Sequence, residues 1–256
     1  MKYITSIWFT LLLVACLIGL RIDDSNIIQE LRLTVFDQYI KSIPLKESND
    51  IVLLNISEES LGSLGQYPFP RHTYAQMISD LRNANAGMIA FTMMFPEADR
   101  FGGDEVFASW IKDNGIILSQ DADPSGRSTT APYVGTAIFG TGDPLDWVIK
   151  YDGLVTNIPA LEEGAWGHGL INGMPEVDGV VRRIPLISQI NDQLYPSLAL
   201  ETIRVIQNRP SYTVKVNDIG VEEIILRPFR IPTDANGSRW RNYNYKFTER
   251  DFGASE

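Results

Sequence analysis

Three short apolar runs alternate with two amphipathic helical patterns in the first half of the chain, and this alternation constrains the fold most strongly. The apolar runs occupy residues 51–57, 87–95 and 115–120, and such runs are typical of buried strands. Between them, residues 74–81 and 106–111 carry apolar side chains at helical spacing. The order strand, helix, strand, helix, strand implies parallel pairing with right-handed crossovers. The sequence therefore predicts an α/β fold with a mixed, largely parallel sheet flanked by helices.

Further strands and turns follow in the second half of the chain. Residues 168–190 read as two strands joined at Asp178. Residues 212–216 and 222–232 are also predicted strands, and Ser197 is the expected cap of the helix before them.

The N-terminal stretch of residues 3–20 contains no charged side chain. A membrane-spanning helix needs roughly 17–25 residues, so this stretch is near the lower limit. Three interpretations compete: an uncleaved signal anchor, a cleaved signal peptide, and a bacterial lipoprotein signal with Cys16 as the acylated residue. The apolar run continues beyond Cys16 to Leu20, which favours the uncleaved anchor over both alternatives. Lys2 weakly favours an N-terminus in the cytoplasm.

The predicted organisation has three parts. Residues 1–22 are the signal anchor or transmembrane helix, and residues 23–48 contain an amphipathic juxtamembrane helix. Residues 49–256 form the main domain, which we expect outside the cytoplasmic membrane. The predicted fold is thus an α/β domain preceded by an N-terminal transmembrane helix.

Composition excludes several classes of function. The formal net charge of -10 argues against a nucleic-acid partner, because such binding depends on clustered Lys and Arg. The single cysteine, Cys16, rules out a disulfide within the chain. The two histidines, His72 and His168, form no zinc-binding spacing with it, so we expect no metal and no cofactor.

No catalytic signature is present in the sequence. The chain has no nucleophile elbow, no P-loop and no complete dinucleotide-binding fingerprint. Glu97 and Asp99 are the only pair considered for acid/base chemistry, and solvated loop carboxylates are the favoured interpretation of both. The chain is therefore not expected to be an enzyme.

A rigid loop precedes the first predicted helix of the main domain. Pro68 and Pro70 fix the backbone there, and Arg71 follows directly at the start of the helical pattern. Ligands bind at the carboxyl ends of strands in open parallel sheets, so Arg71 is expected on the rim of the pocket. It either binds an anion or braces the loop by pairing with Glu97 or Asp99. The brace is favoured, because two neighbouring carboxylates repel an anion.

Three stretches resemble the second type of CHASE domain, a sensory domain associated with cyclases and histidine kinases. The first combines Gly65, the run of residues 67–71, and the acidic loop after the next apolar run. The second stretch is residues 178–186 with residues 195–201, and the third is residues 231–243. The first stretch contains the candidate rim or structural residues Arg71, Glu97, Asp99 and Arg100, and the second contains Asp178, Arg182 and Arg183.

The resemblance implies an extracytoplasmic sensory domain of a bacterial membrane-bound signalling protein. Members of the family usually continue through further transmembrane spans into a cyclase or kinase module, so the resemblance implies a C-terminally incomplete domain here. We therefore expect a missing strand after residue 247 and an open sheet edge, which predicts marginal stability or self-association. Thr92 stands where the family usually has Asp, so this chain lacks any function that depends on the Asp carboxylate at that position.

The function predicted from this resemblance is sensing of an unknown small molecule or physical stimulus from the inner membrane, facing the periplasm. The membrane is the expected partner of the N-terminal helix, and a homodimer is a candidate assembly. Two alternatives stay open: a periplasmic interaction or structural module, and a hydrolase that uses Glu97 and Asp99.

Overall fold

The computed structural model describes residues 7–126, 135–241 and 243–251. The chain divides into two compact units. The small unit comprises Met1–Val52, Pro175–Arg182 and Asn242–Thr248, and the large unit comprises Leu53–Met174, Arg183–Arg241 and Glu249–Glu256.

The small unit begins with two helices, α1 (Ile7–Asp23) and α2 (Asn26–Ser42). Every residue of α1 is exposed, whereas α2 buries Leu33. Among the residues described, no helix is both long enough and apolar enough to cross a membrane. The expected span at residues 3–20 includes residues 3–6, which lie outside the described residues.

Two strands, β1 (Lys46–Asn55) and β15 (Tyr245–Asp251), form a two-stranded sheet. The prediction that the first apolar run joins the parallel sheet is therefore wrong. Ile51 and Val52 are also about half exposed (52% and 55%), so this run is not a buried strand. Strand β15 extends to Asp251 and pairs with β1 alone among the described residues, so the expectation of a further strand after residue 247 stays a prediction.

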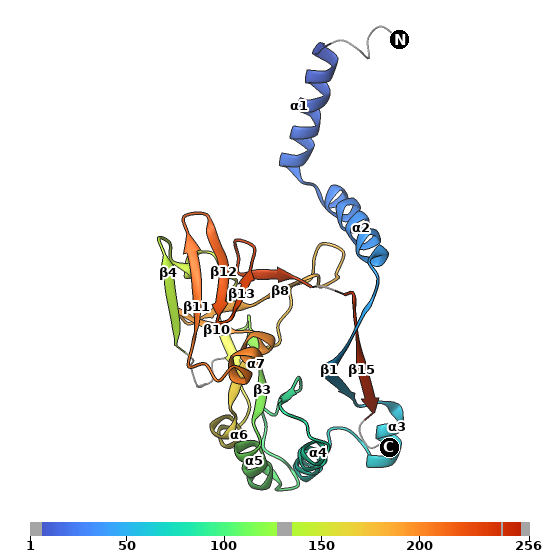
Figure 1. Cartoon of the computed structure of the whole chain (residues 1–256), viewed down its shortest axis with the longest axis vertical. Coiled ribbons are helices and arrows are strands. Elements are labelled where there is room, and N and C mark those ends of the chain that lie inside the picture. The colour runs from blue at the N-terminus through green and yellow to red at the C-terminus, as the bar shows by residue number, and fades with distance from the viewer. Residues whose placement is uncertain (1–6, 127–134, 242, 252–256) are drawn as a thin grey trace. The chain divides into compact units, whose positions relative to one another are not determined.

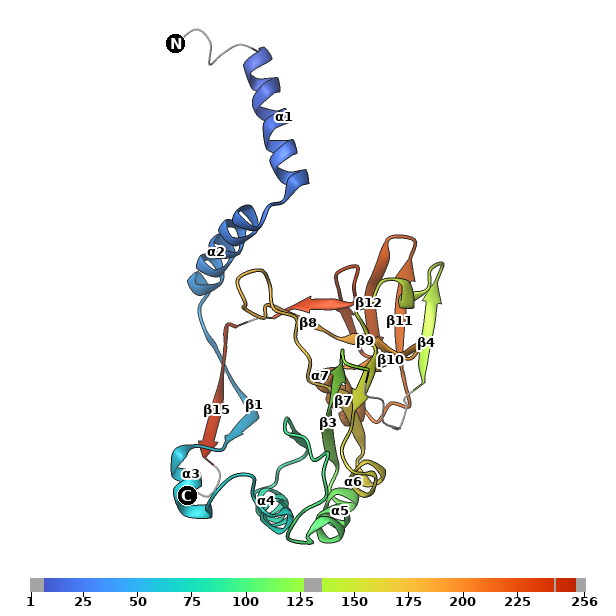
Figure 2. The ribbon, with the colours of Figure 1, turned by 180° about the vertical axis from the view of Figure 1, so that it is seen from behind.

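The first sheet of the large unit is built around one buried strand, β3 (Ile116–Asp123). Strands β2 (Ile89–Phe91) and β7 (Gly167–Leu170) pair with it in parallel, and β6 (Gly153–Val155) pairs with it antiparallel. The predicted parallel pairing of the second and third apolar runs is thus confirmed. Figure 2 shows β3 and β7 side by side, with α5 and α6 close to one end of them.

Four helices contribute to the core beneath this sheet, and the apolar stripes at residues 74–81 and 106–111 predict the second and third of them. They are α3 (Glu58–Leu64), α4 (Arg71–Asn83), α5 (Asp104–Asp113) and α6 (Pro159–Gly164). Helix α5 packs against both α4 and α6 (Figure 1). Their apolar faces meet β2 and β3 in one core, which contains Phe69, Tyr74, Ile78, Phe91, Phe95, Phe107, Ile111 and Leu118.

A second sheet in the large unit has the order β13-β12-β11-β4. Its strands are β4 (Thr136–Gly140), β11 (Tyr212–Asn217), β12 (Gly220–Leu226) and β13 (Phe229–Pro232). Only the β11–β4 pair is parallel, and these two strands lie side by side in Figure 1. Helix α7 (Leu198–Ile206) contributes Leu200 to the core of this sheet, and the Ser197 side chain caps its start, as predicted.

Several short strands complete the large unit. They are β5 (Lys150–Tyr151), β8 (Arg183–Pro185), β9 (Ile187–Ile190), β10 (Gln193–Pro196) and β14 (Ser238–Trp240), with a 3-10 turn at Pro144–Asp146. The fold is therefore mixed α/β, as predicted, but its strands are divided among several sheets. Of the two strands predicted across residues 168–190, only an antiparallel bridge between Met174 and Arg183 spans the turn at Asp178, and the main partners differ, because β7 pairs with β3 and β8 pairs with β14.

Candidate functional site

The rigid loop before α4 delivers Arg71 as the first residue of the helix. Pro70 is the cap residue, which suits proline because the residue before a first turn needs no helical hydrogen bond. Phe69 is buried in the core and its ring lies 6.1 Å from that of Tyr74, whereas Tyr67 is half exposed. Burial of Phe69 fixes the loop, so the position of Arg71 is set by the core beneath it.

The Arg71 side chain is only 9% exposed and has protein partners on several sides. Its Nε lies 3.1 Å from Oδ1 of Asp104, and its Nη2 donates to the backbone carbonyl of Glu97 at 2.8 Å. The guanidinium carbon also lies 4.5 Å from the centre of the Phe95 ring. Arg71 therefore joins the start of α4, the start of α5 and the loop between them.

Asp99 organises the same corner through the backbone. Its Oδ2 accepts hydrogen bonds from the amides of Arg71 and Gly103, both at 3.1 Å, and its Oδ1 accepts from Phe101 at 3.2 Å. Partial burial raises the pKa of this carboxyl, but the three backbone hydrogen bonds and Arg71 outweigh it and hold the pKa below its ordinary value. Asp99 is thus held as a carboxylate, which suits a structural anion and not a proton donor.

Two sequence candidates take different places from those expected. Glu97 is exposed and contributes its backbone carbonyl to Arg71. Arg100 is exposed and stacks 4.9 Å from the ring centre of Phe101. The carboxylate that forms the ion pair with Arg71 is Asp104, and not Glu97 or Asp99 as expected.

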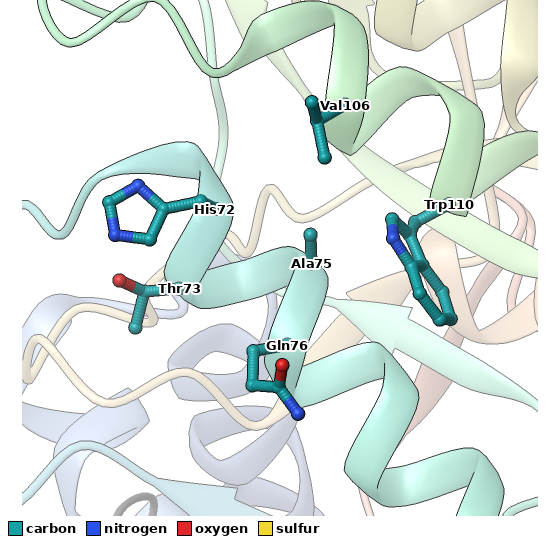
Figure 3. A pocket seen from close by; sticks show the side chains of 6 residues that line it. All are labelled: His72, Thr73, Ala75, Gln76, Val106 and Trp110. Atoms are coloured by element: carbon teal, nitrogen blue, oxygen red, sulfur yellow. The ribbon is translucent and has the colours of Figure 1, made fainter.

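An open groove of about 460 Å³ lies beside this corner, between α4 and α5. His72, Thr73, Ala75 and Gln76 of α4 and Val106 and Trp110 of α5 line it. Figure 3 shows the residues of the two helices on its two sides. The groove offers an apolar wall at Val106 and Trp110, and polar groups at His72 and Gln76.

The second group of candidates lies in the small unit, around Arg182. This side chain is only 2% exposed, and its guanidinium contacts two carboxylates. Nε and Nη2 donate to Asp37 at 2.8 and 2.7 Å, while Nη1 and Nη2 donate to Asp178 at 2.8 and 2.7 Å. These bonds lower the pKa of Asp178 to about 2 and also hold the pKa of Asp37 below its ordinary value. Helix α2 is therefore tied to the loop that contains Asp178.

Arg183, the next residue, has different surroundings in the large unit. Its Nη1 lies 3.5 Å from Oδ2 of Asp234, and its guanidinium carbon lies 5.5 Å from the Trp240 ring centre. The candidate residues therefore form three groups of contacts, one around each of Arg71, Arg182 and Arg183.

A buried polar network in the large unit escaped sequence analysis. Glu162 is 4% exposed, and its Oε1 accepts from the backbone and side-chain nitrogens of Asn157 at 2.8 and 2.7 Å. Its Oε2 lies 2.9 Å from Nε2 of Gln120 and 3.0 Å from Nε2 of His168. Burial raises the pKa of Glu162, but His168 and Asn157 outweigh it and hold the pKa below its ordinary value.

A family model described as the CHASE2 domain matches residues 9–255. The chain belongs to the CHASE2 family. No curated protein and no solved structure matches it. CHASE2 domains are extracytoplasmic sensor domains of signalling proteins and are typically non-catalytic. The resemblance found in the sequence is thus confirmed over nearly the whole chain.

The candidate residues Arg71, Asp99 and Arg182 of this CHASE2 domain are held by ion pairs and hydrogen bonds to other parts of the chain. Within residues 7–126, 135–241 and 243–251, no three His, Cys, Asp or Glu side chains are grouped to hold a metal ion. Thr92, at the position where the family usually has Asp, lies exposed directly after β2. The groove between α4 and α5 is the concave surface next to the loop that carries the family likeness.

Proposed function

We propose that this CHASE2 domain is the sensory region of a bacterial membrane-bound signalling protein and lies on the periplasmic side of the inner membrane. The match over residues 9–255 carries the proposal. Residues 7–20 of α1 carry no charge and are all exposed, which supports an N-terminal signal anchor at residues 1–22. In this scheme, residues 23–48 lead from the membrane to the sensor domain, and a cyclase or kinase module is the output.

The groove between α4 and α5 is the proposed place where a small-molecule stimulus binds. Val106 and Trp110 suit an aromatic or aliphatic part of a ligand, and His72 and Gln76 suit a polar group. Arg71 is the proposed brace that holds the rim of this groove, because it is buried and paired with Asp104. Gly103 allows the start of α5 to lie close to Arg71, because a Cβ at position 103 would be only 2.9 Å from the Cβ of Arg71.

Fusion of reporters after Glu256 tests the proposed topology. A reporter that is active only in the periplasm is expected to be active, and a cytoplasmic reporter is expected to be inactive. The reverse pattern contradicts the proposal. Acylation of Cys16 that globomycin blocks would replace the signal anchor with the lipoprotein alternative.

A periplasmic interaction module is the second candidate, and one surface favours it. The outer side of α2 exposes four large apolar side chains at intervals of one turn: Ile27, Leu31, Val35 and Tyr39. Partner capture without ligand binding in the groove would favour this candidate. The hydrolase alternative has no such support, because both Asp99 oxygens already accept backbone hydrogen bonds.

A further inference from the structure

One edge of the second sheet exposes apolar side chains. Strand β4 is the last strand of the order β13-β12-β11-β4 and has β11 on one side. Ile138 is 53% exposed and Phe139 is 63% exposed. An edge strand of this kind presents unpaired backbone amides and carbonyls, which another strand can bind.

The opposite edge of the same sheet is protected, and β4 is not. Strand β13 carries Arg230, which pairs with Glu223, and ends at Pro232. Charged side chains and prolines on an edge strand discourage pairing with another chain. Residues 135–142, which contain β4, include neither a charged residue nor a proline. Among the described residues no strand covers the free edge of β4, so the sheet can accept a further strand there.

Ile138 is also the end of an apolar row that crosses the sheet. Its neighbour in register is Val214 of β11, followed by Ile224 of β12 and Ile231 of β13. Residues paired across neighbouring strands point to the same face. Val214 and Ile224 are fully buried, whereas Ile138 at the end of the row is half exposed. A further apolar side chain beside Ile138 would continue the row.

We propose that two copies of the chain pair antiparallel through β4, with Ile138 opposite Ile138 of the second copy. The apolar row then runs through both sheets without interruption. In this register Ala137 faces Phe139 of the second copy, so a small side chain meets a large one on the other face. This surface would be the interface of the homodimer that the sequence analysis left as a candidate assembly, and the proposal does not depend on the sensory role.

The lack of charge at this edge suits a second copy as its occupant, whereas the net charge of the chain opposes association elsewhere on the surface. Each chain carries a formal net charge of -10, so two copies repel each other over most of their surfaces. The uncharged stretch of residues 135–142 lets them meet without placing like charges opposite each other. A single patch that pairs with itself also closes the assembly at two copies, because such an interface is two-fold symmetric.

Disulfide trapping tests the register. In a Cys16→Ser background of the full chain in mild detergent, Ile138→Cys is expected to form a dimer under mild oxidation. Directly opposed residues of antiparallel strands have Cα atoms about 4.5–5.5 Å apart, which a disulfide can bridge. Thr136→Cys is the matched control, because its copies would be about 14 Å apart at the rise of a strand. Equal trapping at both positions, or trapping at neither, overturns the proposal.

Light scattering after size exclusion gives an independent measurement. Phe139→Lys is expected to raise the dissociation constant of the dimer at least about tenfold, because it places a charge in an apolar contact. Phe229→Lys, on the protected edge strand β13, is the matched control and is expected to leave the dimer unchanged. A monomer at all concentrations, or an unaltered dimer with Phe139→Lys, contradicts the proposal. Circular dichroism of each variant shows whether it is folded, and the reporter fusions test the sensory role separately.

Discussion

Replacing Arg71 with alanine is expected to destabilise the large unit strongly. The substitution removes an ion pair to Asp104, a hydrogen bond to the Glu97 carbonyl and a ring contact with Phe95. Breaking a buried pair typically costs about 3–5 kcal/mol, because the remaining charge has no partner. Asp104 is 20% exposed, so water reaches it, and we expect the lower end, about 3 kcal/mol.

Thermal unfolding followed by circular dichroism measures this loss. For a domain of this size, 1 kcal/mol corresponds to about 2–4 °C, so Arg71→Ala is expected to lower Tm by about 6–12 °C. Arg100→Ala is the matched control, because Arg100 is exposed and stacks only on Phe101. Its effect is expected to stay within about 0.5 kcal/mol.

A double-mutant cycle separates the ion pair from the other contacts of Arg71. Asp104→Ala removes the same pair from the other side, so the two substitutions together are expected to cost less than their sum, by about 1–3 kcal/mol. A loss below about 1 kcal/mol for Arg71→Ala, or strict additivity with Asp104→Ala, would refute the brace.

Three further substitutions have expected outcomes. Arg182→Lys removes the two-carboxylate contact of the guanidinium, so the α2 amides are expected to exchange with deuterium about tenfold faster by mass spectrometry. Glu162→Gln is expected to flatten the fall of stability in acid, measured by urea unfolding below pH 4.5. Burial raises and His168 lowers the pKa of Glu162, with a net decrease, so its contribution is present above 4.5 and is lost as pH falls through the folded-state pKa. Gly169→Ala is expected to cost about 1–3 kcal/mol, because its Cβ would lie 2.3 Å from the α7 backbone, whereas Gly62→Ala, with nothing within 4 Å, is expected to be neutral or stabilising in the same thermal assay.

Local patterns in the sequence predict α4, α5 and α7 of the large unit and part of the first sheet, but not the short helices α3 and α6. Tyr74 and Ile78 of α4 are buried, as their spacing predicts, and so are Phe107 and Ile111 of α5. Such positions depend on periodicity along a short segment, which a single sequence contains. The rigid loop likewise identified Arg71 as the first residue of a helix.

Pairings between distant segments were beyond these patterns. Strand β1 pairs with β15 near the other end of the chain, and an apolar run does not specify which strand lies beside it. The run at residues 51–57 was predicted to be buried because branched side chains usually are, yet Ile51 and Val52 are exposed in a two-stranded sheet.

The polar contacts of the candidate sites were harder still to predict. Three acidic residues lie in the loop before α5 and at the start of that helix: Glu97, Asp99 and Asp104. Only the geometry selects Asp104 as the ion-pair partner of Arg71. Glu162 and His168 carry no signal in their spacing that would show burial. The buried charge of Glu162 is tolerated because Asn157 and Gln120 complete the hydrogen bonds of the carboxylate.

The central claim is that the large unit lies outside the cytoplasmic membrane. Cysteine labelling tests this claim most directly. In a Cys16→Ser background, Ser109→Cys places a thiol on the exposed side of α5, whereas Ser119→Cys places one in β3 with no exposure. A membrane-impermeant maleimide added to cells with an intact cytoplasmic membrane is expected to label Ser109→Cys and to leave Ser119→Cys unlabelled until the protein is unfolded. Labelling of Ser109→Cys only after the cytoplasmic membrane is broken would contradict an extracytoplasmic sensor.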